Sequence, residues 1–357
     1  MERKIVVKIY KDIQKIKEQW EELDQLASAK IQAGDLPYVN YSFYQTYPWN
    51  CFLSKTYNGI FYHTVFLMAE EEGEPLMILP LILDRFNKRM RLLSGRIAGV
   101  LNAACPYQDQ RGEAAAEQML RFLKTEFGKE WKYKFKDIPL HSVFFQSMLT
   151  TGVSHSERES YHIPLSEFEN YDAYLSSLGK NIYKNIRKSY NHLVTDGKQM
   201  SLSIHTVDNP PSRRLLFKIW KLYFQRKLAW NKKKKSLSKS LLSRMRAVMN
   251  TVAGRQTKSM MKLRASELYV MTIDGEVAAF MHAYVHENHV LMPKLAIDTT
   301  FSRYSPGILL IQESVKLLME REMVDLDMCR GDERYKIEVG GRMEPLGGAG
   351  GRISEWK

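Results

Sequence analysis

The segment 298–319, DTTFSRYSPGILLIQESVKLLM, joins a turn to a helix and so offers a seat for an anion. Pro306 and Gly307 indicate the turn, and apolar residues then repeat at helical spacing, at Ile308, Ile311, Val315 and Leu318. The first turn of a helix has backbone N–H groups without intrahelical partners and carries the positive end of the helix dipole. A phosphate group binds readily at such a start, although an ordinary capped helix explains the same pattern.

Ionisable and aromatic side chains gather further along the chain, after the apolar stretch 324–328. They are Arg330, Asp332, Glu333, Arg334, Tyr335 and Lys336. The apolar stretch has the character of a buried strand, and residues that project from the end of a strand into a loop commonly carry out chemistry. A surface turn with an internal ion pair explains the same residues, so this segment on its own leaves both interpretations open.

The chain that must position these residues has 357 residues, which is long for a single core, so we expect two domains. Its 44% hydrophobic and 26% charged residues are typical of a globular protein, and no apolar run approaches the roughly 20 residues of a membrane helix. Three scattered cysteines and an N-terminus without a signal-peptide core predict a cytoplasmic protein. The net charge of +13 favours an anionic partner, which is a nucleotide cofactor, a nucleic acid or an acidic membrane surface.

Two stretches of the sequence share one layout. Residues 64–83 and 268–285 each have the pattern of a strand, a glycine-containing turn and a second strand, with Asp274-Gly275 as a strong hairpin signal. Each leads to a helix, at 113–127 and 308–321, and then to a short strand, at 132–138 and 323–328. The repeated order predicts two copies of one α/β unit with a mixed sheet. The polar stretch 150–160 is the expected join, which gives domains 1–155 and 156–357.

A helical segment is inserted between the two copies, with helices expected at 166–178, 179–197, 211–230 and 236–253. Within it, Lys180, Lys184 and Arg187 fall on one helix face. A solvated basic surface is one interpretation, and a rim that grips phosphates or a polyanionic acceptor is the other. The lysine run 232–235 is expected to be a surface loop, with contact to an anionic membrane as the alternative.

Three histidines, His282, His286 and His289, raise the question of a metal site. They lie on an expected hairpin, where the first two point to one side of the sheet and the third to the other, so we expect no metal. A packing role suits His282 better than a role as a base. The glycine-rich run 347–351 has no strand before it and no helix after it, so it is expected to be a flexible tail and not a phosphate loop.

The stretch 296–336 resembles the C-terminal signature of the CelD/BcsL-type acetyltransferases, a branch of the GNAT superfamily. That signature is a strand ending in Asp, a Tyr-Ser-Pro-Gly turn, a helix, a strand, and then Gly-Asp-x-x-Tyr-Lys. The matching residues are Asp298, Tyr304, Ser305, Pro306, Gly307, Gly331, Asp332, Tyr335 and Lys336. The resemblance implies an α/β fold of two tandem GNAT-like (acyl-CoA N-acyltransferase) domains, as also in FemAB-type proteins, with a cofactor only in the second.

The resemblance also implies a site for acetyl-CoA or another acyl-CoA. In GNAT folds the pantetheine arm lies beside a strand that diverges from its neighbour, and the diphosphate rests on the N–H groups of the following helix start. Here the arm would lie along Leu295 to Ile297, with Arg303 adding a charge-assisted contact to the diphosphate. The diphosphate itself would rest on Tyr304, Ser305, Pro306, Gly307 and Ile308.

For catalysis, the resemblance points to the residues that follow the last strand of the signature. Asp332 would act as the base or anchor the acceptor, and Tyr335 would protonate the departing thiolate. Lys336 would stabilise negative charge or hold the carboxylate of Asp332.

The leading hypothesis is an acyltransferase that moves an acetyl or other acyl group from acyl-CoA to an amine or hydroxyl of a small molecule or glycan precursor, without a metal. Polysaccharide biosynthesis is suggested by the family name alone. One alternative is FemAB-like transfer from aminoacyl-tRNA, which suits the positive charge and the basic face at 180–188. The other is a non-catalytic protein of the same fold that binds a polyanion or a membrane-associated synthase. The sequence does not decide the acceptor or the oligomeric state.

Overall fold

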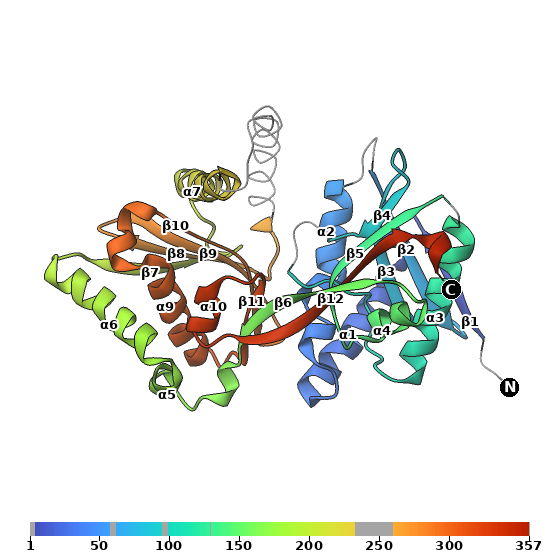
Figure 1. Ribbon diagram of the computed structural model, residues 1–357, viewed down its shortest axis with the longest axis horizontal. Coiled ribbons are helices and arrows are strands. Elements are labelled where there is room, and N and C mark those ends of the chain that lie inside the picture. Colours follow the sequence, from blue (N-terminus) through green and yellow to red (C-terminus); the bar gives the residue numbers. More distant parts are fainter. Residues whose placement is uncertain (1–3, 58–61, 95–98, 129, 233–259, 357) are drawn as a thin grey trace. The chain divides into compact units, whose positions relative to one another are not determined.

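The computed structural model describes residues 4–57, 62–94, 99–128, 130–232 and 260–356 (Figure 1). Contacts within the chain divide it into two compact units. The first comprises Met1–Tyr161, Cys329–Asp332 and Met343–Lys357, and the second comprises His162–Met328 and Glu333–Arg342. The expected single join at 155–156 therefore differs from the structure, because the C-terminal residues pack with the first unit.

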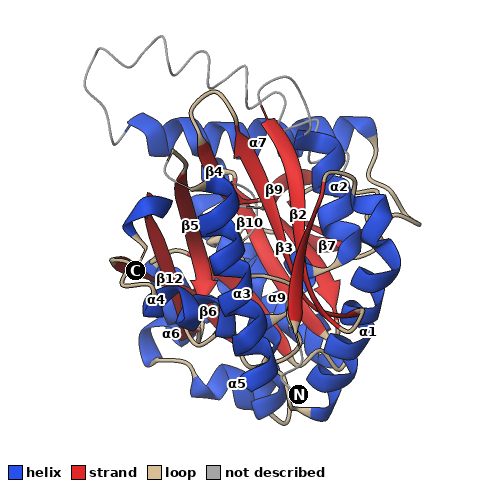
Figure 2. Ribbon diagram, turned by 90° about the vertical axis from the view of Figure 1, so that its right-hand side faces the viewer, coloured by secondary structure: helices blue, strands red, loops and turns tan. Residues whose placement is uncertain are grey.

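The first unit is a mixed sheet with helices packed on its strands (Figure 2). The strand order is β1-β2-β3-β4-β5-β12-β6. β4 and β5 pair in parallel, whereas β1–β2, β2–β3, β3–β4 and β5–β12 are antiparallel pairs. The strands are β1 (Ile5–Tyr10), β2 (Tyr62–Glu71), β3 (Glu74–Asp84), β4 (Arg89–Leu92), β5 (Lys132–Pro139), β6 (His155–Ile163) and β12 (Arg342–Arg352). The helices are α1 (Lys17–Ala33), α2 (Tyr47–Tyr57), α3 (Gln110–Phe127) and α4 (Val143–Thr150).

The second unit has the strand order β11-β10-β9-β8-β7. These strands are β7 (Met200–His205), β8 (Ser266–Ile273), β9 (Glu276–His286), β10 (His289–Ile297) and β11 (Asp325–Arg330). The helices are α5 (Tyr171–Ser177), α6 (Lys180–Thr195), α7 (Arg213–Lys232), α9 (Pro306–Glu320) and α10 (Arg334–Glu338), and the short 3-10 helix η6 (Thr299–Tyr304) precedes α9.

The two units repeat one order of elements, as the sequence predicts. The hairpins β2–β3 and β8–β9 both turn through two residues of positive φ, at Glu72 and Gly73 (φ 53 and 92) and at Asp274 and Gly275 (φ 49 and 76). Glycine accepts this backbone conformation without strain, which is why such turns favour Asp-Gly. After each hairpin come a strand, a helix and a further strand, β4-α3-β5 in one unit and β10-α9-β11 in the other.

The glycine-rich C-terminal run is part of a strand and not a flexible tail. β12 pairs antiparallel with β5, from Leu346↔Pro139 to Arg352↔Lys132. A Cβ atom on Gly347 would lie 2.1 Å from the ring of Phe145, so glycine is needed where α4 packs against this strand. The expectation of a tail is wrong because the partner strand is distant in the sequence.

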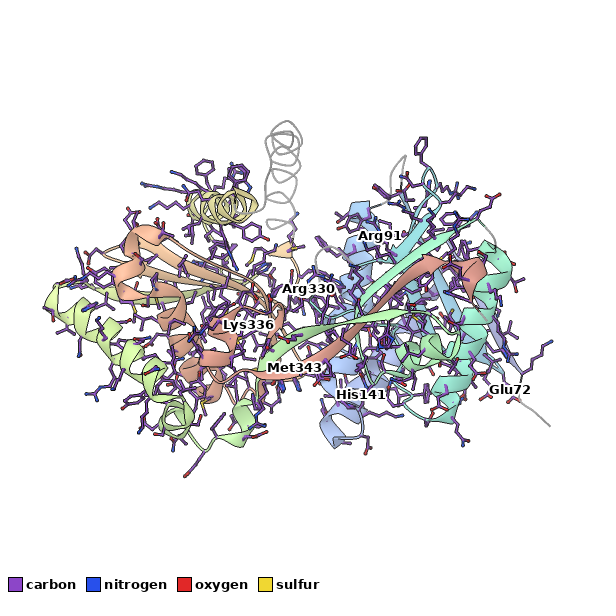
Figure 3. The ribbon with its side chains drawn as sticks, in the orientation of Figure 1. Glu72, Arg91, His141, Arg330, Lys336 and Met343 are labelled. Atoms are coloured by element: carbon purple, nitrogen blue, oxygen red, sulfur yellow. The ribbon has the colours of Figure 1, made fainter. Side chains whose placement is uncertain are left out.

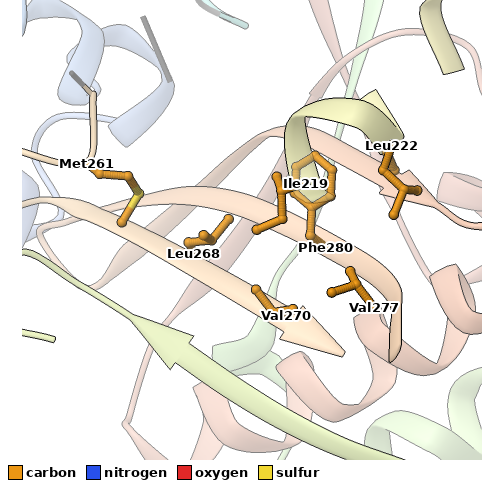
Figure 4. Packing of buried hydrophobic residues seen from close by; sticks show 8 residues of the cluster. Ile219, Leu222, Met261, Leu268, Val270, Val277 and Phe280 are labelled. Atoms are coloured by element: carbon orange, nitrogen blue, oxygen red, sulfur yellow. The ribbon is translucent and has the colours of Figure 1, made fainter. Parts of the chain in front are cut away.

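The core of the second unit includes a cluster between α7 and the sheet (Figure 4). Ile219 and Leu222 of α7 pack on buried residues of the three central strands, namely Leu268, Val270, Val277, Phe280 and Ala296. This agrees with the helix expected at 211–230. The helix expected at 236–253 and Lys233–Lys235 lie outside the described residues. Within the described part of the chain, no helix has the length and apolar character of a membrane span.

Candidate functional site

Strands β10 and β11 separate shortly after they begin to pair. Their parallel register runs from His289↔Asp325 to Leu291↔Asp327, and both strands then continue, β10 as far as Ile297. The pairing of β10 with β9 shifts register between Leu291 and Lys294, so the strand has an irregularity where the separation begins. Pro293 at this place has no N–H group to donate to a neighbour. A strand that continues beyond the end of its pairing is a place where an extended ligand can add to a sheet.

The turn into α9 has fewer open amides than the sequence predicts. Ser305, at φ 47 and ψ 53, is the N-cap, and its own N–H group donates to Ser302 O at 3.1 Å. The Ile308 N–H group donates to Ser305 O at 2.9 Å, and Pro306 has no N–H group. Gly307 N–H is the amide of this turn that has no backbone acceptor among the described residues. An anion at this place would therefore bind mainly at Gly307.

Three of the residues predicted for the cofactor meet at this turn. A Cβ atom on Gly307 would lie 2.9 Å from Ile297 Cγ2 and 3.6 Å from Leu295 Cδ2. Side chains at alternate positions share one face of a strand, so Leu295 and Ile297 both support the first turn of α9. Gly307 thus lets the helix start approach β10 closely, in the part of the strand that lies beyond the pairing with β11.

Arg303 and Tyr304 bind a carboxylate of the protein instead of standing free for a phosphate. Arg303 makes a two-pronged contact with Asp196, at 2.8 and 3.1 Å, and the Tyr304 hydroxyl donates to the same carboxylate at 2.9 Å. These hydrogen bonds, from Arg303 and then from Tyr304, lower the pKa of Asp196 from its ordinary value. The sequence analysis missed Asp196, the C-terminal residue that caps α6. It holds the end of α6 against the loop before α9.

The basic residues of α6 lie on an exposed face, as expected. Lys180, Lys184 and Arg187 are exposed, whereas Ile182, Ile186 and Leu193 are buried on the opposite side of the helix. The helix rises about 1.5 Å per residue, so Lys180 at its start lies about 24 Å from its C-terminal end, where Asp196 binds Arg303. The structure therefore does not bring Lys180 to the turn before α9.

The cluster after β11 is largely engaged in ion pairs. Figure 3 labels two of its residues, Arg330 and Lys336. Arg330 pairs with the fully buried carboxylate of Asp137 on β5, and Arg334 pairs with Glu338 one helical turn further, at 2.8 Å. The Arg334–Glu338 contact matches the plainer interpretation of this segment, a surface turn with an internal ion pair, whereas Arg330 pairs with a residue of a strand that is distant in the sequence. Asp332 is exposed and belongs to the first unit, whereas Tyr335 is partly buried and lies on α10 of the second.

Lys336 is buried and paired with Glu333. Its side chain is 2% exposed, and its Nζ atom lies 3.1 Å from Glu333 Oε2. Arg226 of α7 lies 3.8 Å from the other oxygen of that carboxylate. Lys336 was expected to stabilise negative charge or to hold the carboxylate of Asp332, and the structure gives it the carboxylate of Glu333 as a partner. Glu333 is a further residue that the sequence analysis did not assign.

Lys294 of β10 lies near the turn into α9 in the sequence and was not among the predicted site residues. Its neighbours in the sequence of β10 are apolar, and it follows the place where the pairing with β11 ends. A charged residue in an apolar strand is the feature of the sequence that could have identified it. Its cross-strand neighbour is His282, so both side chains share the face covered by α7, where Lys294 lies 5.7 Å from the ring of Tyr223.

His282 has a packing role, as the sequence suggests. It is fully buried and lies 2.7 Å from the Ser266 hydroxyl, and burial, with a smaller effect of Lys294, holds its pKa well below the ordinary value. No metal cluster forms around it or elsewhere in the described residues.

In the first unit, the place between β4 and β5 that corresponds to the separation of β10 and β11 is occupied by a segment of the chain itself. β4 pairs with β5 only at Arg89↔Lys132 and Met90↔Tyr133. Beyond them, the buried segment 100–105 joins the flanking strands: Ala104 exchanges two backbone hydrogen bonds with Ile78 of β3, at 2.8 and 2.9 Å, and Leu101 N–H donates to Asp137 O of β5 at 2.7 Å. An extended ligand would have to displace this segment.

Residues 180–337 match the family described as the acetyltransferase (GNAT) domain. The second unit has the GNAT fold. The match covers the two strands that separate, β10 and β11, and the helix α9, whose first turn contacts β10 at Gly307. No curated protein matches the sequence.

Solved structures with the same fold extend over nearly the whole chain. The C-terminal domain of a protein assigned as a lysylphosphatidylglycerol synthetase, from Agrobacterium fabrum, is 11% identical with a TM-score of 0.55, over 94% of this chain and 92% of that one. A tandem GNAT protein from the clavulanic acid pathway is 10% identical with a TM-score of 0.54, over 97% and 98%. FemX is 11% identical with a TM-score of 0.50, over 92% and 95%. At these identities the likeness shows the fold alone.

Proposed function

We propose that the protein is an acyltransferase that takes an acetyl or other acyl group from acyl-CoA, held by the second unit, and transfers it to an amine or hydroxyl of a small molecule or glycan precursor. The observation that carries this proposal is the separation of β10 from β11 directly before a helix start that has Gly307 in its first turn. This arrangement lies inside the stretch that matches the GNAT domain.

The residues present fit an acyl-CoA molecule. Its extended pantetheine arm needs a strand edge beyond the end of a strand pairing, and the register of β10 with β11 ends at Leu291 while β10 continues to Ile297. Its diphosphate needs N–H donors at a helix start, which the Gly307 amide supplies, in a cradle that a side chain at this residue would disturb. Acyl-CoA supplies an activated thioester carbonyl. Arg303, held by Asp196, positions the turn and is not assigned to the diphosphate.

The remaining chemistry falls to residues near the end of β11. The acceptor must lose a proton as it attacks the carbonyl carbon, and the sulfur must gain one as the C–S bond breaks. We assign the first role to Asp332, which is exposed, and the second to the Tyr335 hydroxyl. Lys336 keeps a structural role, because its ammonium group is buried against Glu333.

The first unit has a supporting role in this proposal. Segment 100–105 bridges β3 and β5 at the place where a donor would have to lie, so we assign no acyl-CoA to this unit. Its contribution would be structural or on the acceptor side.

Calorimetry with acetyl-CoA tests the proposal. We expect one binding site in the wild type and a loss of about tenfold in affinity, about 1.4 kcal/mol, in Gly307→Ala. Gly179→Ala is the matched control, because Gly179 also stands at a helix start of the second unit but a Cβ atom there would meet nothing within 4 Å. Absence of acetyl-CoA binding, together with tRNA binding that weakens steeply with salt, would replace this proposal with aminoacyl-tRNA-dependent transfer.

A further inference from the structure

A hollow of about 650 Å³ lies on one face of the sheet in the first unit. Its lining comes from β4, β5, β12 and the start of β6, and includes Arg89, Arg91, Lys132, Lys134, Lys136 and Arg352. We call it the basic groove. None of its lining residues belongs to the donor site proposed for the second unit.

The strand pattern explains why so many cations share this face. Along β5, Lys132 and Lys134 are exposed and Lys136 is half-buried, whereas the residues between them, Tyr133 and Phe135, are buried in the core. Alternate residues of a strand point to opposite faces, so the lysines form one row on the open face. Arg89 and Arg91 repeat the pattern on β4, on either side of buried Met90 (Figure 3 labels Arg91).

Glycines of β12 keep the groove open. Gly350 is paired with Lys134 and Arg352 with Lys132, and residues paired across two strands share a face. A Cβ atom on Gly350 would lie 3.3 Å from Tyr133 O, and one on Gly348 would lie 3.4 Å from Lys136 Cα. Larger residues at these two positions would fill the space between the cationic rows.

The groove has a strong excess of positive charge. Among its lining residues Glu355 is the one carboxylate, and it accepts a hydrogen bond from Arg352 N–H at 3.1 Å. The pKa of Lys136 is lowered by its burial and then by the nearby charges of Arg158 and Lys134. Cations that repel one another on a concave surface favour a multiply charged anion.

We propose that the basic groove binds a small molecule that carries two or more phosphate groups. The volume lies within the range of about 300 to 1,000 Å³ of small-ligand sites. Along β5 the lysines repeat at about 6.6 to 6.8 Å, and neighbouring strands lie about 4.8 Å apart, so adjacent phosphates can each meet a cation. A single carboxylate would leave most of the cations without a partner. The proposal does not depend on acyl-CoA binding in the second unit.

Calorimetry with inorganic tripolyphosphate, pyrophosphate and orthophosphate tests this site. We expect one tripolyphosphate per chain, weaker pyrophosphate and much weaker orthophosphate. The charge reversal Lys132→Glu/Lys134→Glu should weaken tripolyphosphate by about tenfold or more. Lys11→Glu/Lys15→Glu, an equal change at two exposed lysines near β1, at the other edge of the sheet, should leave the affinity within about twofold.

The two proposed sites can be told apart. Gly307→Ala should spare tripolyphosphate binding, and Lys132→Glu/Lys134→Glu should spare acetyl-CoA binding. An equal loss of tripolyphosphate affinity in the two charge-reversal variants would show that the groove is not a specific site. Loss of acetyl-CoA binding in Lys132→Glu/Lys134→Glu would also contradict the proposal. A short RNA duplex that binds more tightly than tripolyphosphate would overturn the assignment to a small molecule.

Discussion

A Cβ atom added to Gly307 would lie 2.9 Å from Ile297 Cγ2. This distance is too short for a side chain at residue 307 unless one of the two residues moves. This contact links the first turn of α9 to the part of β10 that has left β11. The two features that the proposed donor site requires, the part of β10 beyond its pairing with β11 and the start of α9, are therefore in direct contact.

A double-mutant cycle at these two residues tests the arrangement. Gly307→Ala should lower the free energy of unfolding by about 1 to 3 kcal/mol, because the added methyl group overpacks the contact. In the Ile297→Ala background, where Cγ2 is absent, the same substitution should cost clearly less, and acetyl-CoA affinity should be restored in part. Thermal unfolding and calorimetry measure both quantities. Additive effects would show that the contact does not govern the turn.

The pair Arg303 and Asp196 distinguishes positioning of the turn from direct phosphate binding. If Arg303 acts through Asp196, Arg303→Ala and Asp196→Ala should raise the KM for acyl-CoA by similar factors, about fivefold or less, and the double variant should be no worse than either. The measurement is steady-state kinetics at several acyl-CoA concentrations. An effect of Arg303→Ala that greatly exceeds that of Asp196→Ala would mean that Arg303 contacts the diphosphate itself.

Substitution of Lys336 is expected to lower the free energy of unfolding, and we assign this residue no direct role in catalysis. Lys336→Met removes the buried ammonium group that pairs with the partly exposed carboxylate of Glu333 and should lower the free energy of unfolding by about 1 to 3 kcal/mol. Adding Glu333→Gln should recover part of that loss, because the carboxylate that would be left with Arg226 alone, at 3.8 Å, is then removed. Chemical denaturation measures this. A Lys336→Met protein of full stability with abolished turnover would instead support the catalytic role first suggested by the sequence.

We propose that Tyr335 and Asp332 carry the proton-transfer roles, and substitution of each residue tests this. Tyr335→Phe and Asp332→Asn should each lower kcat by about 100-fold or more with smaller changes in KM, since general acid–base catalysis contributes factors of this size. Tyr183→Phe on α6 is a control for the loss of a hydroxyl group outside the proposed site. Near-normal turnover of both Tyr335→Phe and Asp332→Asn would remove these residues from the mechanism.

The buried imidazole of His282 should make the protein less stable as the pH falls. Burial lowers its folded-state pKa well below the ordinary value of 6.5, so the folded protein keeps this imidazole neutral while the unfolded chain takes up a proton as the pH falls. The free energy of unfolding should therefore fall below about pH 6.5, by up to about 1.4 kcal/mol per pH unit from this group. His282→Gln should show a shallower decline between pH 7 and pH 5. Parallel profiles for the two proteins would contradict this assignment.

Local signals were sufficient for much of the fold. Asp274 and Gly275 predicted a hairpin because a tight turn needs two residues of positive φ, and the structure has them at φ 49 and 76. The spacing of Ile311, Val315 and Leu318 predicted α9, where all three are buried. The repeated order of hairpin, helix and strand follows from such signals, since each is encoded over a few residues.

Contacts between distant residues were not encoded in this way. Asp196 lies 107 residues before Arg303, so nothing beside Arg303 revealed that its charge was already engaged. The strand β12 was hidden because glycine is a poor strand former, and its use became clear only with Phe145 packed against Gly347. Lys294 did leave a local sign, a cation in an apolar strand, which the sequence analysis did not use.

Hydrogen exchange with and without acetyl-CoA addresses the central claim, that the separated edge of β10 and the start of α9 hold an acyl donor. We expect added protection of backbone amides between Met292 and Ile297 and at Gly307, with no change in segment 100–105 of the first unit. Protection that appears only outside β10 and α9, or no protection at saturating acetyl-CoA, would contradict it.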